Sequence, residues 1–118
     1  MEDNRFFREA FKMSLHERLP YVVIGEAGSG EEALQRINGT PPDLIFTDRR
    51  LTGMNGLDLA QKLRKDFPRI RIAMLTGYDL PEYRRGASQH GMDRFFVKDS
   101  LDWKELKEFV QDIPKDNR

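Results

Sequence analysis

The chain has 118 residues, enough for one ordinary domain and too few for two. Its 20 basic and 20 acidic residues cancel, so we expect neither direct nucleic acid binding nor attraction to an anionic membrane. It has no cysteine, which excludes a disulfide framework, a catalytic thiol and a cysteine metal site. No apolar run approaches the roughly 18 residues of a membrane span, and the polar, acidic start is not typical of a signal peptide. We therefore expect a cytoplasmic protein.

The first 40 residues predict a helix, a strand and a second helix. Apolar residues recur at helical spacing over residues 6–15, and Pro20 ends that helix. The β-branched run 21–25 predicts a strand. Ser29, with Glu32 three residues later, forms a capping box that predicts the start of the second helix.

The middle of the chain predicts two strands that flank a helix. Residues 44–47 are apolar without alternation, which is typical of a strand covered on both faces. A loop containing Gly53 and Gly56 leads to a helix whose apolar face lies within residues 57–63, and residues 70–75 predict the next strand.

The last third predicts a helix that begins at Pro81, a strand over residues 95–97 and a final helix capped by Ser100. We expect one domain over residues 1–113, followed by a polar tail over residues 114–118. Strict alternation of helices and strands predicts an α/β fold, with a doubly wound parallel sheet between two layers of helices.

Three predicted strands are each followed by one reactive or charged residue: Asp48, Thr76 and Lys98. A parallel sheet gathers the carboxyl ends of its strands on one edge, and ligands bind at that edge. Each residue alone has a structural explanation, as a turn residue, a helix cap or a surface charge. Together they predict a carboxylate, a hydroxyl and an ammonium group in one cleft.

Two more carboxylates, Glu2 and Asp3, precede the first helix. If that helix packs as a crossover helix, its start lies on the same edge, and both carboxylates approach Asp48. Closely packed carboxylates repel one another, so they favour a divalent cation, and Mg²⁺ fits best. Helix capping is the structural alternative for Glu2 and Asp3.

Four stretches resemble the receiver domains of two-component response regulators. Residues 43–56 resemble the phosphoacceptor strand and loop, residues 72–78 the fourth strand with its switch hydroxyl, residues 95–99 the fifth strand with its lysine, and residues 2–4 the acidic pair. The four occur in the family's order and cover nearly the whole chain. The resemblance implies a flavodoxin-like receiver fold.

The resemblance also implies a role for each site residue. Asp48 accepts a phosphoryl group from a sensor histidine kinase, and Lys98 pairs with a phosphoryl oxygen. Glu2 and Asp3, together with the Asp48 carboxylate and the Arg50 backbone carbonyl, hold Mg²⁺.

Two further pairs of residues have implied roles in switching and in lifetime. Thr76 turns inward and the aromatic Phe95 follows, which changes the face of the fourth helix, fifth strand and fifth helix and so controls a partner protein or output domain. Arg50 and Tyr78, each two residues beyond a site residue, flank the phosphoryl group and slow its hydrolysis. The chain is therefore expected to be a signalling domain and not an enzyme.

The start of the chain departs from the family pattern. Only Met1 precedes Glu2, so most or all of the buried first strand is missing, and Thr52 stands where the family usually has proline. A missing central strand leaves unpaired edges, which predicts a homodimer or a strand-exchanged dimer. These departures also leave an alternative open: a degenerate receiver that takes no phosphate and acts as a dimerisation or protein-interaction module.

Overall fold

Three short apolar segments form the central parallel sheet: β1 (Leu44–Asp48), β4 (Arg71–Thr76) and β5 (Arg94–Val97). The computed structural model describes residues 1–51 and 53–112. The strands pair in the order β1-β4-β5, all parallel, with Phe46 opposite Ala73 and Thr76 opposite Val97. The predicted α/β class with a parallel sheet is confirmed.

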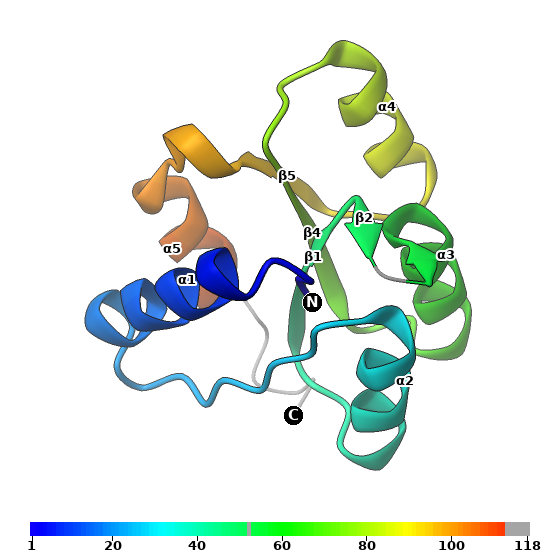
Figure 1. Cartoon of the computed structure of the whole chain (residues 1–118), viewed down its shortest axis with the longest axis horizontal. Coiled ribbons are helices and arrows are strands. Elements are labelled where there is room, and N and C mark those ends of the chain that lie inside the picture. The colour runs from blue at the N-terminus through cyan, green and yellow to red at the C-terminus, as the bar shows by residue number, and fades with distance from the viewer. Residues whose placement is uncertain (52, 113–118) are drawn as a thin grey trace.

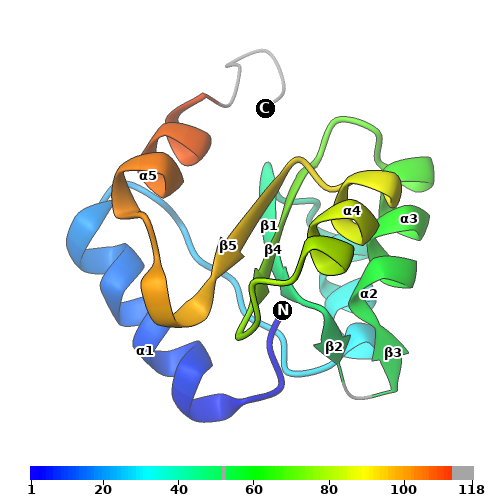
Figure 2. The same cartoon turned by 90° about the horizontal axis from the view of Figure 1, so that it is seen from above.

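Helices cover both faces of this sheet (Figures 1 and 2). Helices α1 and α5 pack on one face, and α2, α3 and α4 pack on the other. No helix in residues 1–51 or 53–112 is long and apolar enough to cross a membrane. The helices span α1 (Arg5–Arg18), α2 (Gly30–Gly39), α3 (Gly56–Asp66), α4 (Pro81–Gln89) and α5 (Trp103–Gln111).

The middle strand, β4, explains why its sequence lacks alternation. Ile72 and Met74 belong to the apolar cluster beneath α2, α3 and α4, whereas Ala73 and Leu75 belong to the cluster beneath α1 and α5. Successive side chains of a strand point to opposite faces, so a strand with two covered faces is apolar throughout. The carboxyl end of β4 is therefore held rigidly where the site begins.

The predicted strand over residues 21–25 is wrong. No strand is assigned there, and Val23 is fully exposed. A strand needs a hydrogen-bonded neighbour, and within residues 1–51 and 53–112 the backbone partner on the outer side of β1 is Met1. The Met1 ammonium group donates to the Phe46 carbonyl, and the Asp48 N–H donates to the Met1 carbonyl at 3.0 Å. These two bonds have the pattern of parallel pairing, limited to one residue.

In the described part of the chain, Met1 is the one backbone partner on this side of β1, so most of the strand's length there has no backbone hydrogen bond. The N–H and carbonyl of alternate residues in a strand face the same side, so Leu44 and Phe46 face the side on which Met1 lies. The next residue, Glu2, does not continue this pairing with β1. Its N–H donates instead to the Ala27 carbonyl at 3.0 Å. The Phe46 carbonyl is occupied by Met1, so we call the Leu44 N–H and carbonyl and the Phe46 N–H on this side the open edge of β1. The expectation that most of the first strand is missing agrees with this geometry.

The last helix begins later than predicted. Ser100 does not cap it; this residue ends a short 3-10 turn, η1 (Lys98–Ser100). Asp102 is the cap, and its carboxylate accepts a hydrogen bond from the Glu105 N–H at 3.1 Å. Asp and Ser are comparable helix caps, so sequence alone could not choose between them.

A small antiparallel hairpin, not predicted from the sequence, follows β1. It consists of β2 (Arg50–Leu51) and β3 (Met54–Asn55). Gly53 has φ of +77°, a conformation that favours glycine. The departure noted at Thr52 lies outside the described residues.

Candidate functional site

The predicted strand-end residues meet at one edge of the sheet. Lys98 Nζ donates to Asp48 Oδ2 at 3.0 Å, from the end of β5 to the end of β1. Both side chains and Thr76 line one cavity of about 490 Å³, which we call the Asp48 pocket. Its lining consists of Asp48, Arg49, Arg50, Thr76, Gly77, Tyr78, Tyr83 and Lys98.

The two N-terminal carboxylates reach the same place. Carboxylate oxygens of Glu2, Asp3 and Asp48 lie within 4.8 Å of one another. Glu2 is only 4% exposed, whereas Asp3 is exposed. The alternative for these two residues, helix capping, is not what the structure shows, because Asn4 caps α1.

Lys98 lies between the acidic groups. It donates to Glu2 as well as to Asp48, and its ammonium nitrogen lies 4.5 Å from the centre of the Phe7 ring. Burial raises the pKa of Glu2 above its ordinary value, and the nearby charge of Asp48 raises it further, although the Lys98 hydrogen bond opposes the rise. Burial lowers the pKa of Lys98, but its hydrogen bonds to Glu2 and Asp48 outweigh that effect and leave the pKa raised. Lys98 is therefore a fixed positive charge.

The donor set suits a hard divalent cation. Three carboxylates of similar reach offer oxygen ligands, which Mg²⁺ prefers, and the Asp48 pocket leaves room for water and phosphoryl oxygens. The Arg50 backbone carbonyl remains a predicted fourth ligand. Its own side chain is exposed at the start of β2.

The two predicted switch residues lie on neighbouring strands: Thr76 ends β4, and Phe95 lies near the start of β5, opposite Met74. Thr76 is 3% exposed, and its hydroxyl accepts a hydrogen bond from the Tyr78 N–H at 3.3 Å. Phe95 is half-buried, with the Arg84 guanidinium 4.5 Å from the centre of its ring. Arg84 also pairs with Asp79 at 2.7 Å. Both residues therefore contact the segment that leads into and begins α4, Thr76 through Tyr78 and Phe95 through Arg84.

One group of supporting residues escaped the sequence analysis. Arg8 donates to the Glu2 carbonyl at 2.7 Å, and Glu26 pairs with Arg8 at 3.4 Å and with Lys12 at 2.6 Å. These contacts tie α1 to the segment before α2 and so fix Glu2 in the cluster. Spacing of four residues puts Arg8 and Lys12 on one helix face, but nothing in the sequence identifies Glu26 as their partner.

Arg49 and Tyr83 were also missed as members of the site. The Arg49 guanidinium lies 4.2 Å from the centre of the Tyr83 ring, and both residues line the Asp48 pocket. Tyr83 belongs to α4, 34 positions from Arg49 in the chain. Only the folded chain brings the two together.

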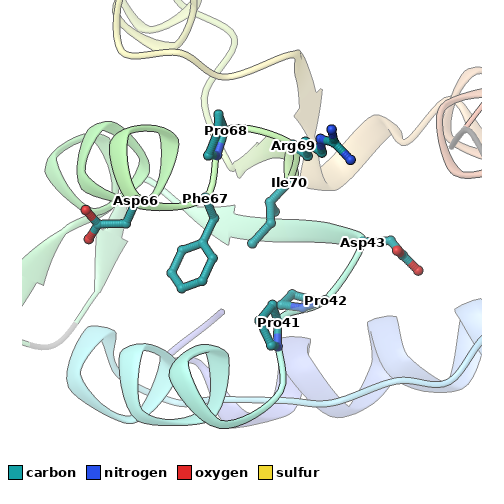
Figure 3. A pocket seen from close by; sticks show the side chains of 8 residues that line it. All are labelled: Pro41, Pro42, Asp43, Asp66, Phe67, Pro68, Arg69 and Ile70. Atoms are coloured by element: carbon teal, nitrogen blue, oxygen red, sulfur yellow. The ribbon is translucent and has the colours of Figure 1, made fainter. Parts of the chain in front are cut away.

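A second cavity, of about 400 Å³, lies at the opposite edge of the sheet (Figure 3). It is formed by the residues that precede β1 and β4, which places it at the amino ends of the strands. The carboxylates of Asp43 and Asp66 point away from one another there, and Phe67 and Pro41 fill the space between. No group of reactive side chains converges in this cavity.

Comparison with known proteins gives a consistent result. Residues 1–111 match the family described as response regulator receiver domain. The response regulator protein VraR of Staphylococcus saprophyticus is 31% identical over 100 residues, which are 83% of this chain and 47% of that protein. VraR of Staphylococcus aureus shows the same identity and coverage. The chain thus spans about half the length of these curated relatives.

Solved structures share the fold. A two-component response regulator of the LuxR family from Aurantimonas sp. superposes with a TM-score of 0.82 and 25% identity, over 93% of this chain and 78% of that one. The chemotaxis protein CheY4 of Vibrio cholerae superposes with a TM-score of 0.81 over 96% and 93% of the two chains; at 22% identity it shows the fold alone. Both superpositions cover more than nine-tenths of this chain and show the same overall fold.

Proposed function

This chain belongs to the family of response regulator receiver domains, and from that premise we propose that it is a phosphoacceptor switch in which Asp48 takes a phosphoryl group from a sensor histidine kinase. The observation that carries the proposal is the position of Asp48. Its carboxylate shares a pocket with Lys98 and Thr76 and lies within the cluster of Glu2 and Asp3. Receiver domains are signalling domains, and we propose that this one acts in the cytoplasm.

The residues suggest how the transfer proceeds. An Asp48 carboxylate oxygen forms a bond to phosphorus while the bond from phosphorus to the kinase imidazole breaks, and the departing imidazole takes up a proton. Lys98 stabilises negative charge on the phosphoryl oxygens. Glu2, Asp3, Asp48 and the Arg50 carbonyl would hold Mg²⁺, which when bound supplies positive charge beside the transferring group.

Phosphorylation would then change the surface formed by α4, β5 and α5. A phosphoryl oxygen offers Thr76 a charged acceptor that is stronger than its present contact with the Tyr78 N–H. Inward movement of Thr76 vacates space, which Phe95 can occupy. We propose that a partner protein, or an output domain of the kind that LuxR-family relatives have, reads the altered surface.

Beryllofluoride, which stands in for the phosphoryl group on an aspartate, tests the proposal. We expect it to bind once per chain and only with Mg²⁺, and we expect Asp48→Ala to abolish binding. Asp66→Ala removes an exposed carboxylate at the far end of α3 and should bind like the unaltered chain. A folded chain that binds no beryllofluoride would refute the proposal, as would undiminished binding by Asp48→Ala.

The open edge of β1 favours a second proposal, that the domain also associates with its own copies. In the described part of the chain, residues 21–25 are the β-branched run left outside the sheet. Such a segment from a second copy could occupy the position beside Leu44 and Phe46. Reciprocal exchange would give a twofold-symmetric dimer. If Asp48 takes no phosphoryl group, this association is the function that remains.

A further inference from the structure

Arg49 occupies a constrained position beside the phosphoacceptor. The Gly56 N–H donates to the Arg49 carbonyl at 2.7 Å, which fixes the backbone. A Cβ at Gly56 would overlap the Asp48 carbonyl, so the loop and the start of α3 pack as closely as glycine allows. The Arg49 side chain must therefore extend into the Asp48 pocket, which it lines.

The Arg49 guanidinium is incompletely satisfied there. Its plane lies over the Tyr83 ring, but its Nε is buried and has no hydrogen-bond partner in the described structure. A buried donor without an acceptor is costly, and the cost is larger for a charged group. Arg49 thus gains free energy from any acceptor that enters the pocket.

A phosphoryl group on Asp48 would bring such acceptors. It adds about 1.5 to 2 negative charges and three strong acceptor oxygens at the residue next to Arg49. A guanidinium matches phosphate oxygens with two parallel hydrogen bonds, an arrangement that an aromatic ring cannot offer. Among the pocket's cationic side chains, Lys98 already bonds to Asp48 and Glu2, whereas Arg49 has an unused buried donor.

We propose that Arg49, in addition to Lys98, is a cationic side chain that contacts the phosphoryl group. This contact moves the Arg49 guanidinium away from the Tyr83 ring and so lowers the local stability of helix α4. The inference rests on the proposed function, because it requires that Asp48 accepts the group. It gives α4 a direct link to the phosphoacceptor loop, separate from the path through Thr76 and Phe95.

Few contacts hold helix α4 in place, so the loss of one contact should lower its local stability measurably. Its cap residue, Leu80, makes no side-chain capping bond, and Ala87 is its one buried residue. Two cation–π pairs attach the helix to the rest of the domain. In one, the Arg49 guanidinium lies over the Tyr83 ring; in the other, the Arg84 guanidinium lies over the Phe95 ring. Few buried contacts give an element a low local stability.

Amide hydrogen exchange over residues 81–89, combined with beryllofluoride titration in Mg²⁺, tests this link. In the unaltered chain we expect beryllofluoride to speed exchange in α4. Arg49→Gln should bind about tenfold more weakly, the scale of one lost charge-assisted hydrogen bond, and α4 exchange should no longer respond to the ligand. Arg85→Gln, which removes an exposed arginine from α4, should behave like the unaltered chain.

A second variant approaches the link from the other side. Tyr83→Leu removes the ring, so α4 should exchange quickly without ligand, and beryllofluoride should bind more tightly because Arg49 is already released. Unchanged affinity in both Arg49→Gln and Tyr83→Leu, or a normal α4 response in Arg49→Gln, would overturn the inference while the proposed function stands. Failure of the unaltered chain to bind beryllofluoride would overturn both.

Discussion

At the scale of single residues, burial of Glu2 connects the metal site to pH. Burial raises the pKa of this carboxyl above 4.5, and Mg²⁺ requires its charged form. The Mg²⁺ dissociation constant should therefore increase as the pH falls through the raised pKa. Calorimetric titration of Mg²⁺ at a series of pH values measures this dependence.

The stability of the metal-free domain should change with pH in the opposite sense. An acid whose folded pKa is raised binds its proton more tightly in the folded state, so its contribution is complete below pH 4.5 and is lost as the pH rises through the folded pKa. Glu2→Gln should flatten both pH profiles. Glu17→Gln, on the exposed side of α1, should leave them unchanged, and equal profiles for the two variants would contradict the assignment.

The lifetime of the proposed phosphoryl group gives a second prediction at the scale of single residues. Arg50 and Tyr78 line the Asp48 pocket, and Tyr78 is 69% exposed, so both side chains stand where water approaches Asp48. Replacing both with alanine should speed dephosphorylation on the order of fivefold, which corresponds to about 1 kcal/mol in the barrier. Phosphate release from the phosphorylated chain measures it. Tyr21→Ala, which removes a similarly exposed tyrosine that does not line the pocket, is the control. An unchanged rate of phosphate release in the double variant would contradict the prediction.

Sequence reasoning located some of these residues and missed others for a physical reason. Asp48, Thr76 and Lys98 were found because each follows an apolar strand, and parallel strands bring their ends together. Arg49 was not identified as a site residue, because its partner Tyr83 lies on a distant helix. Contacts between side chains of distant elements leave no periodic signal in the chain.

At the scale of elements, the hydrophobic pattern identified the five α-helices and the three strands of the parallel sheet that residues 1–51 and 53–112 form. It failed at residues 21–25, where β-branched residues suggested a strand. Strand formation depends on a neighbour that supplies hydrogen bonds, and β propensity describes only fit to a pleated surface. The hairpin of β2 and β3 was missed because each of its strands has only two residues.

The close approach of α3 to the loop after β1 gives a prediction at this scale. A Cβ on Gly56 would overlap the backbone carbonyl of Asp48, and backbone cannot yield as a flexible side chain can. Gly56→Ala should lower the free energy of unfolding by about 1–3 kcal/mol, the usual cost of overpacking. It should also weaken beryllofluoride binding, because the Asp48 backbone must shift.

Gly86 offers a matched control for this substitution. A Cβ there would lie 3.5 Å from Leu57 Cδ1, an ordinary contact, and the residue is inside α4. Gly86→Ala should leave stability unchanged or raise it by up to about 1 kcal/mol, because alanine favours helix. Urea denaturation measures both variants. Equal stability of the two would mean that the approach at Gly56 is not tight.

At the scale of the whole molecule, alternation of helices and strands was enough to predict a doubly wound sheet. It was not enough to predict the order of the strands or the position of β1 at the edge of the sheet. The apolar, unalternating sequence of β1 reflects apolar clusters on both of its faces, and β1 lies at the edge of the three-stranded sheet formed by the described residues. On its outer side, the backbone partner within those residues is Met1.

The open edge of β1 should make self-association depend on concentration. The N–H groups of Leu44 and Phe46 face the open side of β1, whereas those of the residues between them face β4. The Leu44 and Phe46 N–H groups should therefore exchange with solvent quickly at low protein concentration and slowly in a dimer. Light scattering and hydrogen exchange over a concentration series measure the two effects together. Their midpoints should coincide if strand pairing holds the dimer together.

A pair of surface substitutions separates strand exchange from unspecific association. Val23 is fully exposed and lies in the segment that would exchange, whereas Met13 is 64% exposed on α1. A charge on an edge segment opposes strand pairing, so Val23→Lys should keep the chain monomeric, and Met13→Lys should not. If both variants dimerise like the unaltered chain, or if both stay monomeric, the open edge is not the interface. If Val23→Lys alone prevents dimerisation while beryllofluoride binding persists, phosphoacceptance and strand exchange are separate properties of one domain.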